Sequence, residues 1–331
     1  MDAQYAFELQ ILQAFQALNA GLVPLMRFFT FLGKEQFYLL VMPLLYWCID
    51  RQLGIRVGIM LTLSASLNDV LKFAFHSPRP FWITPSVKAI EYETSFGIPS
   101  GHAQNAVAVW GTFASRLKAR WIWIAAVLLM FFIGLSRLFL GVHFPRDVLA
   151  GWLIGAVILA LFLTLEKPIS GWFRTMQAGK QIGILLAVSL GLSAVGWVEK
   201  WLLEGWELPA QWIQNAASAL PSGEVFNPLS LAGLLTSTGA FLGLTSGALW
   251  MEGRGGFTSP SSFVQGLLRF LLGLLGVLLL WFGLGAVFPH GETWLAYLFR
   301  YIRYSLVGLW ISAWAPWLFL RLRLAEKEQQ R

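Results

Sequence analysis

Eight residues of this 331-residue chain have the types and the spacing that binding and cleavage of a phosphate ester require. They form three motifs: Lys-x6-Arg-Pro, Pro-Ser-Gly-His and Ser-Arg-x5-His-x3-Asp. The residues are Lys72, Arg79, Ser100, Gly101, His102, Arg137, His143 and Asp147. Each motif is weak alone, because a cation near a membrane often only snorkels and Pro-Ser-Gly is a common turn. All three together, in this order, predict one site.

The cationic members of the set predict a binding site for a dianionic phosphate. Lys72, Arg79 and Arg137 would supply three positive charges, the arginines as planar bidentate donors. Ser100 would add a hydroxyl donor, and Gly101 would let a backbone N–H approach closely at a helix start, where the dipole favours anions. Such an array would stabilise the equatorial oxygens of the transition state.

The histidines and the aspartate predict covalent catalysis. His143 and Asp147 are four residues apart, and Pro145 favours a helix start that places them on one face. Asp147 would accept the Nδ1 proton of His143, leaving Nε2 to attack phosphorus. His102 would protonate the leaving oxygen and then deprotonate water. Two histidines in separate roles, without a carboxylate cluster, argue against a metal mechanism, so we expect no metal and no cofactor.

The composition predicts an all-α polytopic membrane protein. Hydrophobic residues make up 57% of the chain and charged residues 12%, against about 25% charged residues in soluble domains. The 17 tryptophans and 26 phenylalanines suit a bilayer and its interfaces. The net charge of +7 fits basic cytosolic loops. The chain has no run of basic residues interleaved with polar surface, so nothing in it predicts nucleic-acid binding. We expect membrane lipids, and no nucleic acid, among the partners.

The apolar runs predict about nine spanning helices, preceded by an amphipathic helix at residues 4–20 in the membrane interface. The expected spans are 33–49, 53–75, 102–116, 121–141, 146–165, 182–199, 228–251, 264–288 and 298–321. Residues 1–165 would hold the catalytic core with the N-terminal helix. Residues 166–331 would be a transmembrane extension of no assigned role, after a polar, basic stretch at 166–181.

The loop charges predict an orientation. Basic loops, such as the one with Arg116, Lys118 and Arg120, belong in the cytosol by the positive-inside rule, as does the C-terminus. The motif residues then gather at the opposite, periplasmic or extracellular, face. The chain has no Asn-x-Ser/Thr sequon and no lysine-based ER-retrieval signal at its end, which favours a bacterial plasma membrane.

Two features outside the motifs have alternative interpretations. Glu91 and Glu93 would shape leaving-group selectivity or merely face solvent. The tryptophans between residues 197 and 212 predict an interfacial aromatic belt, and the alternative is a flap that shapes access of the substrate.

The three motifs resemble those of the type-2 phosphatidic acid phosphatase superfamily, which includes membrane-bound acid phosphatases, vanadium haloperoxidases and glucose-6-phosphatase. The resemblance covers about residues 34–165, and every motif position is filled. It implies a six-helix catalytic core, metal-independent chemistry and a site at the non-cytosolic face. By the same resemblance, His102 is the acid–base, His143 is the nucleophile and Asp147 is the partner of His143, and the other five residues bind phosphate. The layout, and the run Arg79-Pro80-Phe81-Trp82, are similar to the glucose-6-phosphatase branch.

Several activities remain open at this point. The first is an integral membrane phosphatase acting on phosphate monoesters or diphosphates of lipids through a phosphohistidine. The second is a sugar-phosphate phosphatase of the glucose-6-phosphatase type. The third is a phosphotransferase, or a non-catalytic membrane transporter that keeps the fold. A transporter predicts a broken motif, and none is broken. A haloperoxidase is disfavoured because those enzymes are soluble.

Overall fold

The computed structural model describes residues 3–18, 20–221, 225–260 and 262–328, and these ranges contain helices and no strand. Within them, six helices are long and apolar enough to cross a membrane. A seventh span results if Tyr5–Ala17 and Ala20–Phe31, bent by 89°, count as one. The all-α, multi-pass membrane class is thereby confirmed, whereas a count of nine spans is not.

The predicted spans match helices whose ends lie within four residues of the expected positions, with one exception. The helices are α3 with η2 (Glu35–Leu44, Leu45–Ile49), α4 (Arg51–Phe75), α6 (Gly101–Leu117), α7 (Arg120–Phe139), α8 (Pro145–Arg174), α9 (Ala178–Leu203), α11 (Ala232–Glu252), α12 with η3 and α13 (Phe263–Leu278, Leu279–Gly283, Leu284–Val287), and α14 with η4 and α15 (Trp294–Leu309, Trp310–Trp314, Ala315–Arg321). Helices α3 with η2, α6, and α14 with its continuation are not among the six candidate spans.

The exception is the end of α8, which lies at Arg174 instead of residue 165. The polar, basic stretch at 166–181 is helical on both sides of a short break, because charged side chains can extend from a helix without ending it. Glu166, for example, pairs with Arg56 at 2.6 Å. Polarity marked the end of the apolar run but not the end of the helix.

Contacts divide the chain into two compact units. The first comprises Met1–Phe37, Leu67–Ala160 and Val195–Ser230, and the second comprises Tyr38–Ser66, Leu161–Ala194 and Leu231–Arg331. The expected boundary near residue 165 remains a prediction, since each contact unit includes segments from both sides of it. All eight motif residues belong to the first unit.

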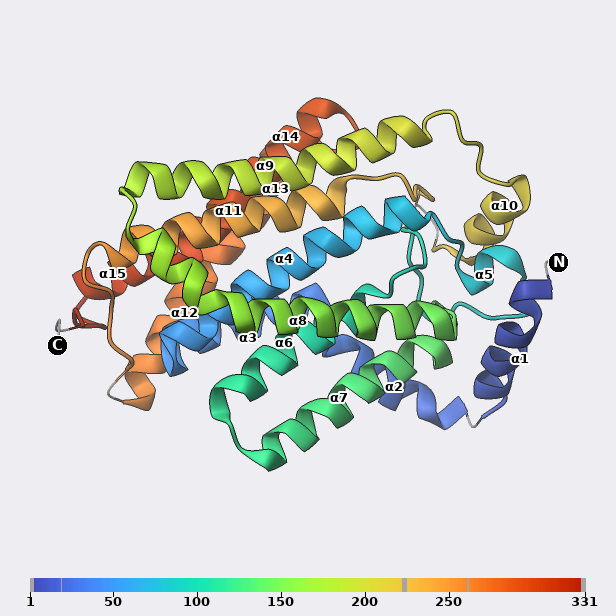
Figure 1. The fold of residues 1–331 in the computed structure, drawn as a ribbon, viewed down its shortest axis with the longest axis horizontal. Helices are drawn as coiled ribbons and strands as arrows, with labels where there is room; N and C mark the ends of the chain where they lie inside the picture. The colour runs from blue at the N-terminus through green and yellow to red at the C-terminus, as the bar shows by residue number, and fades with distance from the viewer. Residues whose placement is uncertain (1–2, 19, 222–224, 261, 329–331) are drawn as a thin grey trace. The chain divides into compact units, whose positions relative to one another are not determined.

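In the first unit, α6 packs against α7, and α7 packs against α2 (Val23–Phe31) (Figure 1). Short helix α5 (Pro80–Ile83) lies beside α10 (Ala210–Ala219), drawn in cyan and yellow. Helix α1 (Ala3–Ala17) buries Leu9 and Leu12 against Val87 and Phe144. The short helices α2, α5 and α10 were not predicted, because none of them is long enough to give a spanning signal.

In the second unit, α11 and α14 approach closely along a line of small residues. A Cβ at Gly239 would lie 2.5 Å from the carbonyl oxygen of Tyr301, and one at Gly243 would lie 1.9 Å from that of Ser305. Only glycine permits this backbone separation, which is a common way for helices to associate in a membrane.

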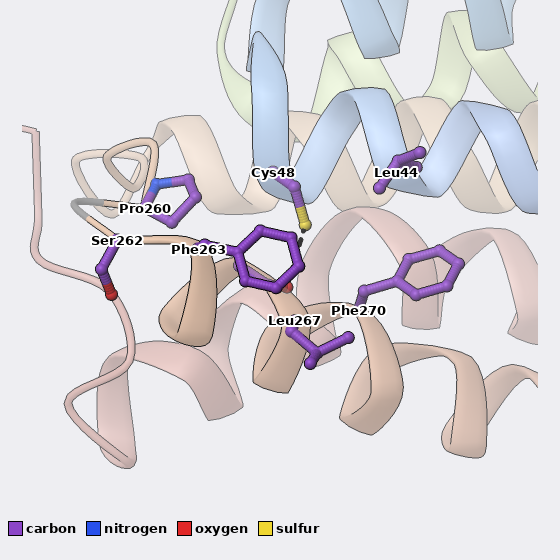
Figure 2. Close-up of a pocket in the computed structure, with 8 residues that line it drawn as sticks. Leu44, Cys48, Pro260, Ser262, Phe263, Leu267 and Phe270 are labelled. Carbon is purple, nitrogen blue, oxygen red and sulfur yellow. Dashed lines mark hydrogen bonds between the residues drawn. The ribbon is translucent and has the colours of Figure 1, made fainter.

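The second unit also contains a cavity of about 480 Å³ (Figure 2). Its lining is mainly apolar and contains none of the motif residues: Leu44, Cys48, Pro260, Ser262, Phe263, Gly266, Leu267 and Phe270. The Cys48 thiol donates to the carbonyl oxygen of Gly266 at 3.3 Å. This lining offers no acid, base or cation for phosphate chemistry.

Candidate active site

Alternating helix ends carry the motif residues. Lys72 lies in the last turn of α4 and Arg137 in the last turn of α7. Arg79 is the residue before α5, Ser100 the residue before α6, and Asp147 lies in the first turn of α8. Helices α4 and α7 end at motif residues, and helices α6 and α8 begin at them. Because ends and beginnings alternate along the chain, these residues can meet at one end of the unit.

Arg79 is fully buried, and all three of its guanidinium nitrogens are hydrogen-bonded. Nε donates to the Ser95 carbonyl at 2.5 Å, and Nη2 donates to the Phe96 carbonyl and to the Ser95 hydroxyl, both at 3.1 Å. Nη1 donates to the Val142 carbonyl at 2.9 Å and lies 3.1 Å from Nε2 of His143. The planar fork is thus fixed between the loop at residues 95–96 and the turn that carries His143.

His143 is held between Arg79 and Asp147. Its Nδ1 lies 3.2 Å from Oδ2 of Asp147, and the same oxygen accepts the Phe144 backbone N–H at 2.8 Å. Because a guanidinium can only donate, Nε2 must be the acceptor toward Arg79, and the proton lies on Nδ1. Burial, and next the positive charge of Arg79, lower the pKa of His143 well below its usual value. The imidazole is therefore a neutral base with its Nε2 lone pair directed at Arg79.

The turn before His143 depends on glycine and on α1. Gly141 has φ +75°, and a Cβ there would lie 2.3 Å from the carbonyl oxygen of Lys88. Gln16 of α1 binds Lys88 twice, donating to its carbonyl at 2.7 Å and accepting its N–H at 3.0 Å. Tyr5 packs on Phe144 with ring centroids 5.3 Å apart. Helix α1, expected to lie in the interface, thus supports the turn, a contact between distant segments that no local pattern signals.

The carboxylate of Glu93 lies among the cations of the site. Nη2 of Arg137 donates to it at 2.5 Å, Nη2 of Arg79 lies 3.8 Å away, and Nδ1 of His102 lies 4.0 Å away. Burial alone would raise the pKa of Glu93, but Arg137, Arg79 and the other nearby positive groups outweigh it and hold the pKa well below its usual value. The sequence left two interpretations for Glu93, a role in leaving-group selectivity or simple exposure to solvent. Neither of them included this direct pairing with the cations.

The remaining motif residues lie around this cluster. Lys72 donates to the Ser95 hydroxyl at 2.8 Å, and Nη1 of Arg137 donates to the hydroxyl of Thr30. Ser95 and Thr30 carried no sequence signal, because each is a single hydroxyl residue outside the motifs.

Four buried polar atoms of the motif residues have no hydrogen-bond partner within the described residues: Oγ of Ser100, Nε2 of His102, Nε of Arg137 and Oδ1 of Asp147. A phosphate ester offers acceptors for the first three of these. Gly101 has a steric role as well, since a Cβ there would lie 2.9 Å from Oδ1 of Asn68. The Asn68 amide in turn donates to the Pro99 carbonyl at 3.2 Å.

Across the described ranges, no group of three or more His, Cys, Asp or Glu side chains is placed to hold a metal ion. The metal-free expectation remains a prediction. The arrangement itself combines a neutral imidazole, a second histidine, buried cations and unpaired donors. These groups suit nucleophilic attack on a phosphoryl group.

The chain matches the model of the PAP2 superfamily over residues 53–169, and that of the PAP2 superfamily phosphatase transmembrane extension over residues 235–327. The chain belongs to the PAP2 superfamily, and it is a PAP2-family phosphatase of the multi-pass membrane type. The resemblance drawn from the three motifs is confirmed.

Three relatives show how the similarity is distributed. An undecaprenyl-diphosphatase of Sulfolobus acidocaldarius is 31% identical over 45% of this chain and 72% of its own. Glucose-6-phosphatase 3 of Bos taurus is 28% identical over 87% of each chain. Sphingosine-1-phosphate phosphatase 1 of Rattus norvegicus is 31% identical over 53% of this chain and 42% of its own.

Proposed function

We propose that this protein hydrolyses phosphate monoesters or diphosphates of lipids through a phosphohistidine formed on His143. The observation that carries the proposal is the buried chain Arg79–His143–Asp147. In it Nε2 lies 3.1 Å from a guanidinium nitrogen and Nδ1 lies 3.2 Å from a carboxylate oxygen. This arrangement fixes the tautomer that a nitrogen nucleophile requires.

The reaction follows in two displacement steps. In the first, Nε2 of His143 forms a bond to phosphorus while the bond to the leaving oxygen breaks, and His102 gives that oxygen a proton. In the second, His102 takes a proton from water, whose oxygen attacks phosphorus and releases His143 and inorganic phosphate. Lys72, Arg79 and Arg137, with the Ser100 hydroxyl and the Gly101 N–H, would bind the phosphoryl oxygens throughout.

A lipid substrate is supported by two kinds of observation. The relatives include an undecaprenyl-diphosphatase and a sphingosine-1-phosphate phosphatase, both named for phosphorylated lipids. The motif residues also lie at ends of apolar helices, where a headgroup can reach the cations while its chains stay in the bilayer.

A sugar phosphate is the second candidate. The observation that favours it is the match to glucose-6-phosphatase 3 over 87% of each chain, a larger share of this chain than the 45% and 53% that the other two relatives cover. Transfer of the phosphoryl group to an alcohol in place of water is compatible with the same site.

We further propose that the site opens on the non-cytosolic face. The connection between α6 and α7 contains Lys118 and is flanked by Arg116 in the last turn of α6 and Arg120 at the start of α7, at the ends of these helices opposite to Ser100 and Arg137. By the positive-inside rule that loop is cytosolic and the site faces the periplasm or the outside. The C-terminus is then cytosolic as well, provided that α14 with η4 and α15 spans the membrane in addition to α7, α8, α9, α11 and α12. The experiment is labelling, in intact bacterial cells, of single cysteines introduced at Lys118 and Lys88 of a Cys48→Ser protein. Labelling of position 118 by an impermeant reagent would contradict the orientation.

The activity is tested by phosphate release from purified protein in detergent with EDTA present. The substrates are phosphatidate, a sphingoid-base phosphate, a polyprenyl diphosphate and glucose 6-phosphate, with His143→Ala as the blank. We expect one lipid to be preferred and a base-stable, acid-labile phosphoprotein to be trapped in the wild type only. Preference for glucose 6-phosphate would support the second candidate. Activity of His143→Ala, or strict dependence on an added divalent ion, would contradict the mechanism.

A further inference from the structure

The segment Val195–Ser230 belongs to the catalytic unit by its contacts, although residues 161–194, which belong to the other unit, separate it from the rest of that unit along the chain. It lies between the two family matches, which end at residue 169 and begin at residue 235. The segment contains α10, which packs on α5, the short helix that directly follows Arg79 (Figure 1).

Aromatic side chains of this segment contact aromatic residues that precede and follow Arg79 in the chain. Trp206 lies 6.1 Å from Phe96 and 5.1 Å from His76, measured between ring centroids. Trp212 lies 6.3 Å from Trp82. These separations and tilted or edge-on geometries are typical of packed aromatic pairs.

Two further contacts hold Trp82. Phe226 lies edge-on to it with centroids 4.8 Å apart, and the Asn215 side-chain amide donates to the Trp82 carbonyl at 2.9 Å. Trp82 itself is fully buried, as is Phe96. The two residues that the segment covers are thus enclosed.

Both covered residues are tied directly to Arg79. The Phe96 carbonyl accepts from Nη2 of Arg79 at 3.1 Å, and the Trp82 backbone N–H donates to the Arg79 carbonyl at 3.1 Å. One residue therefore holds the guanidinium and the other holds the backbone of the arginine that contacts His143. Displacement of either would move a buried charge that has to meet the phosphate accurately.

We propose that Trp206, Trp212 and Asn215 are positioning residues that hold Arg79 in the orientation required for phosphate binding. The proposal rests on the proposed function, and it assigns the segment a role in the chemistry and not in access of the leaving group. The interfacial belt and the access flap considered for these tryptophans predict different behaviour in mutants.

Trp206→Ala is expected to lower kcat/KM by about 10- to 100-fold, because a small misplacement of a positioned charge has effects of that size. The loss should be the same for a long-chain lipid phosphate and for p-nitrophenyl phosphate, since both present the same phosphoryl group. Vanadate should protect the variant less against thermal unfolding than it protects the wild type.

Trp206→Phe should restore most of the activity, because a smaller aromatic ring keeps the packing. Asn215→Ala should show the same pattern more weakly, and it provides the test if Trp206→Ala does not fold.

Trp201→Ala is the matched control, because Trp201 is on the same segment and 66% exposed. Its kinetics should equal those of the wild type. A loss in Trp206→Ala that depends on the leaving group would overturn the proposal in favour of an access flap. Unchanged kinetics of Trp206→Ala with only a lower melting temperature would also overturn it. So would equal losses of kcat/KM in Trp206→Ala and Trp201→Ala. A wild type that neither releases phosphate nor binds vanadate would instead overturn the proposed function, and this proposal with it.

Discussion

Arg79 donates a hydrogen bond to His143 from Nη1 to Nε2 over 3.1 Å, while the same nitrogen donates to the Val142 carbonyl. The lone pair that attack on phosphorus needs is therefore engaged by a residue assigned to phosphate binding. A phosphoryl oxygen that accepts from Nη1 would compete for this donor and release the lone pair. Phosphate binding and activation of the nucleophile are thus expected to be coupled through one side chain.

Arg79→Lys tests this coupling. Lysine keeps the charge but has one nitrogen in place of the three that contact Ser95, Phe96, Val142 and His143. We expect kcat/KM to fall by about 100-fold or more, because a bidentate, buried arginine is not replaced by a point charge. The measurement is steady-state phosphate release, with Arg120→Lys at an exposed position as the control. Activity close to that of the wild type would show that charge alone suffices.

Asp147→Asn should separate orientation of the nucleophile from substrate binding. The asparagine oxygen can still accept the Phe144 N–H, so the start of α8 is expected to persist. The negative charge facing Nδ1 is lost, so the imidazole is less well oriented and its phosphorylated form less stabilised. We expect kcat to fall by about 100-fold with little change in KM, since Asp147 contacts Nδ1 of His143 and the Phe144 N–H and is not one of the residues proposed to bind phosphate. If KM rises by about as much as kcat falls, Asp147 takes part in phosphate binding instead.

Glu93→Gln removes the only carboxylate recorded within 4.0 Å of the Arg137 guanidinium in the described residues. Loss of one partner from a buried ion pair costs about 3–5 kcal/mol, and the 28% exposure of the Glu93 side chain reduces the expected loss to about 1–3 kcal/mol. Orthophosphate or vanadate should then raise the melting temperature of the variant more than that of the wild type, because the anion no longer meets a resident carboxylate.

Glu91→Gln is the matched control for that experiment, because Glu91 pairs with partly exposed cations, Lys34 at 2.8 Å and Arg27 at 3.6 Å, whereas the Arg137 partner of Glu93 is fully buried. It should change the melting temperature little and leave the response to phosphate unaltered. A Glu93→Gln protein with weaker phosphate stabilisation than the wild type would mean that the carboxylate helps to organise the cations instead of competing with the anion.

The long helices were predictable to within a few residues because apolar length is a local property, and the motif residues came together because they lie at alternating helix ends. The end of α8 was not predictable, since Glu166 can form its ion pair from within a helix. Glu93, Thr30 and Ser95 enter the site through contacts over long sequence separations, which no periodicity encodes. The same holds for Trp206, whose aromatic spacing fitted an interfacial belt equally well. The catalytic roles of the eight motif residues remain predictions for the experiments above.

The dependence of stability on pH should report the buried state of His143. Its pKa in the folded protein is lowered well below the usual value, by burial and then by Arg79, whereas in the unfolded chain it is near 6.5. The unfolded state therefore binds the proton first as the pH falls. The stability that the neutral imidazole retains above about pH 6.5 is lost progressively below it, at up to about 1.4 kcal/mol per pH unit.

Unfolding in detergent at pH 7.5, 6.5 and 5.5 should show a shallower decline of stability for His143→Gln than for the wild type. His290→Gln, at an exposed histidine, should decline as the wild type does. Equal slopes for the wild type and His143→Gln would mean that His143 takes up its proton in the folded protein, which would leave it protonated and unable to act as the nucleophile at mildly acidic pH.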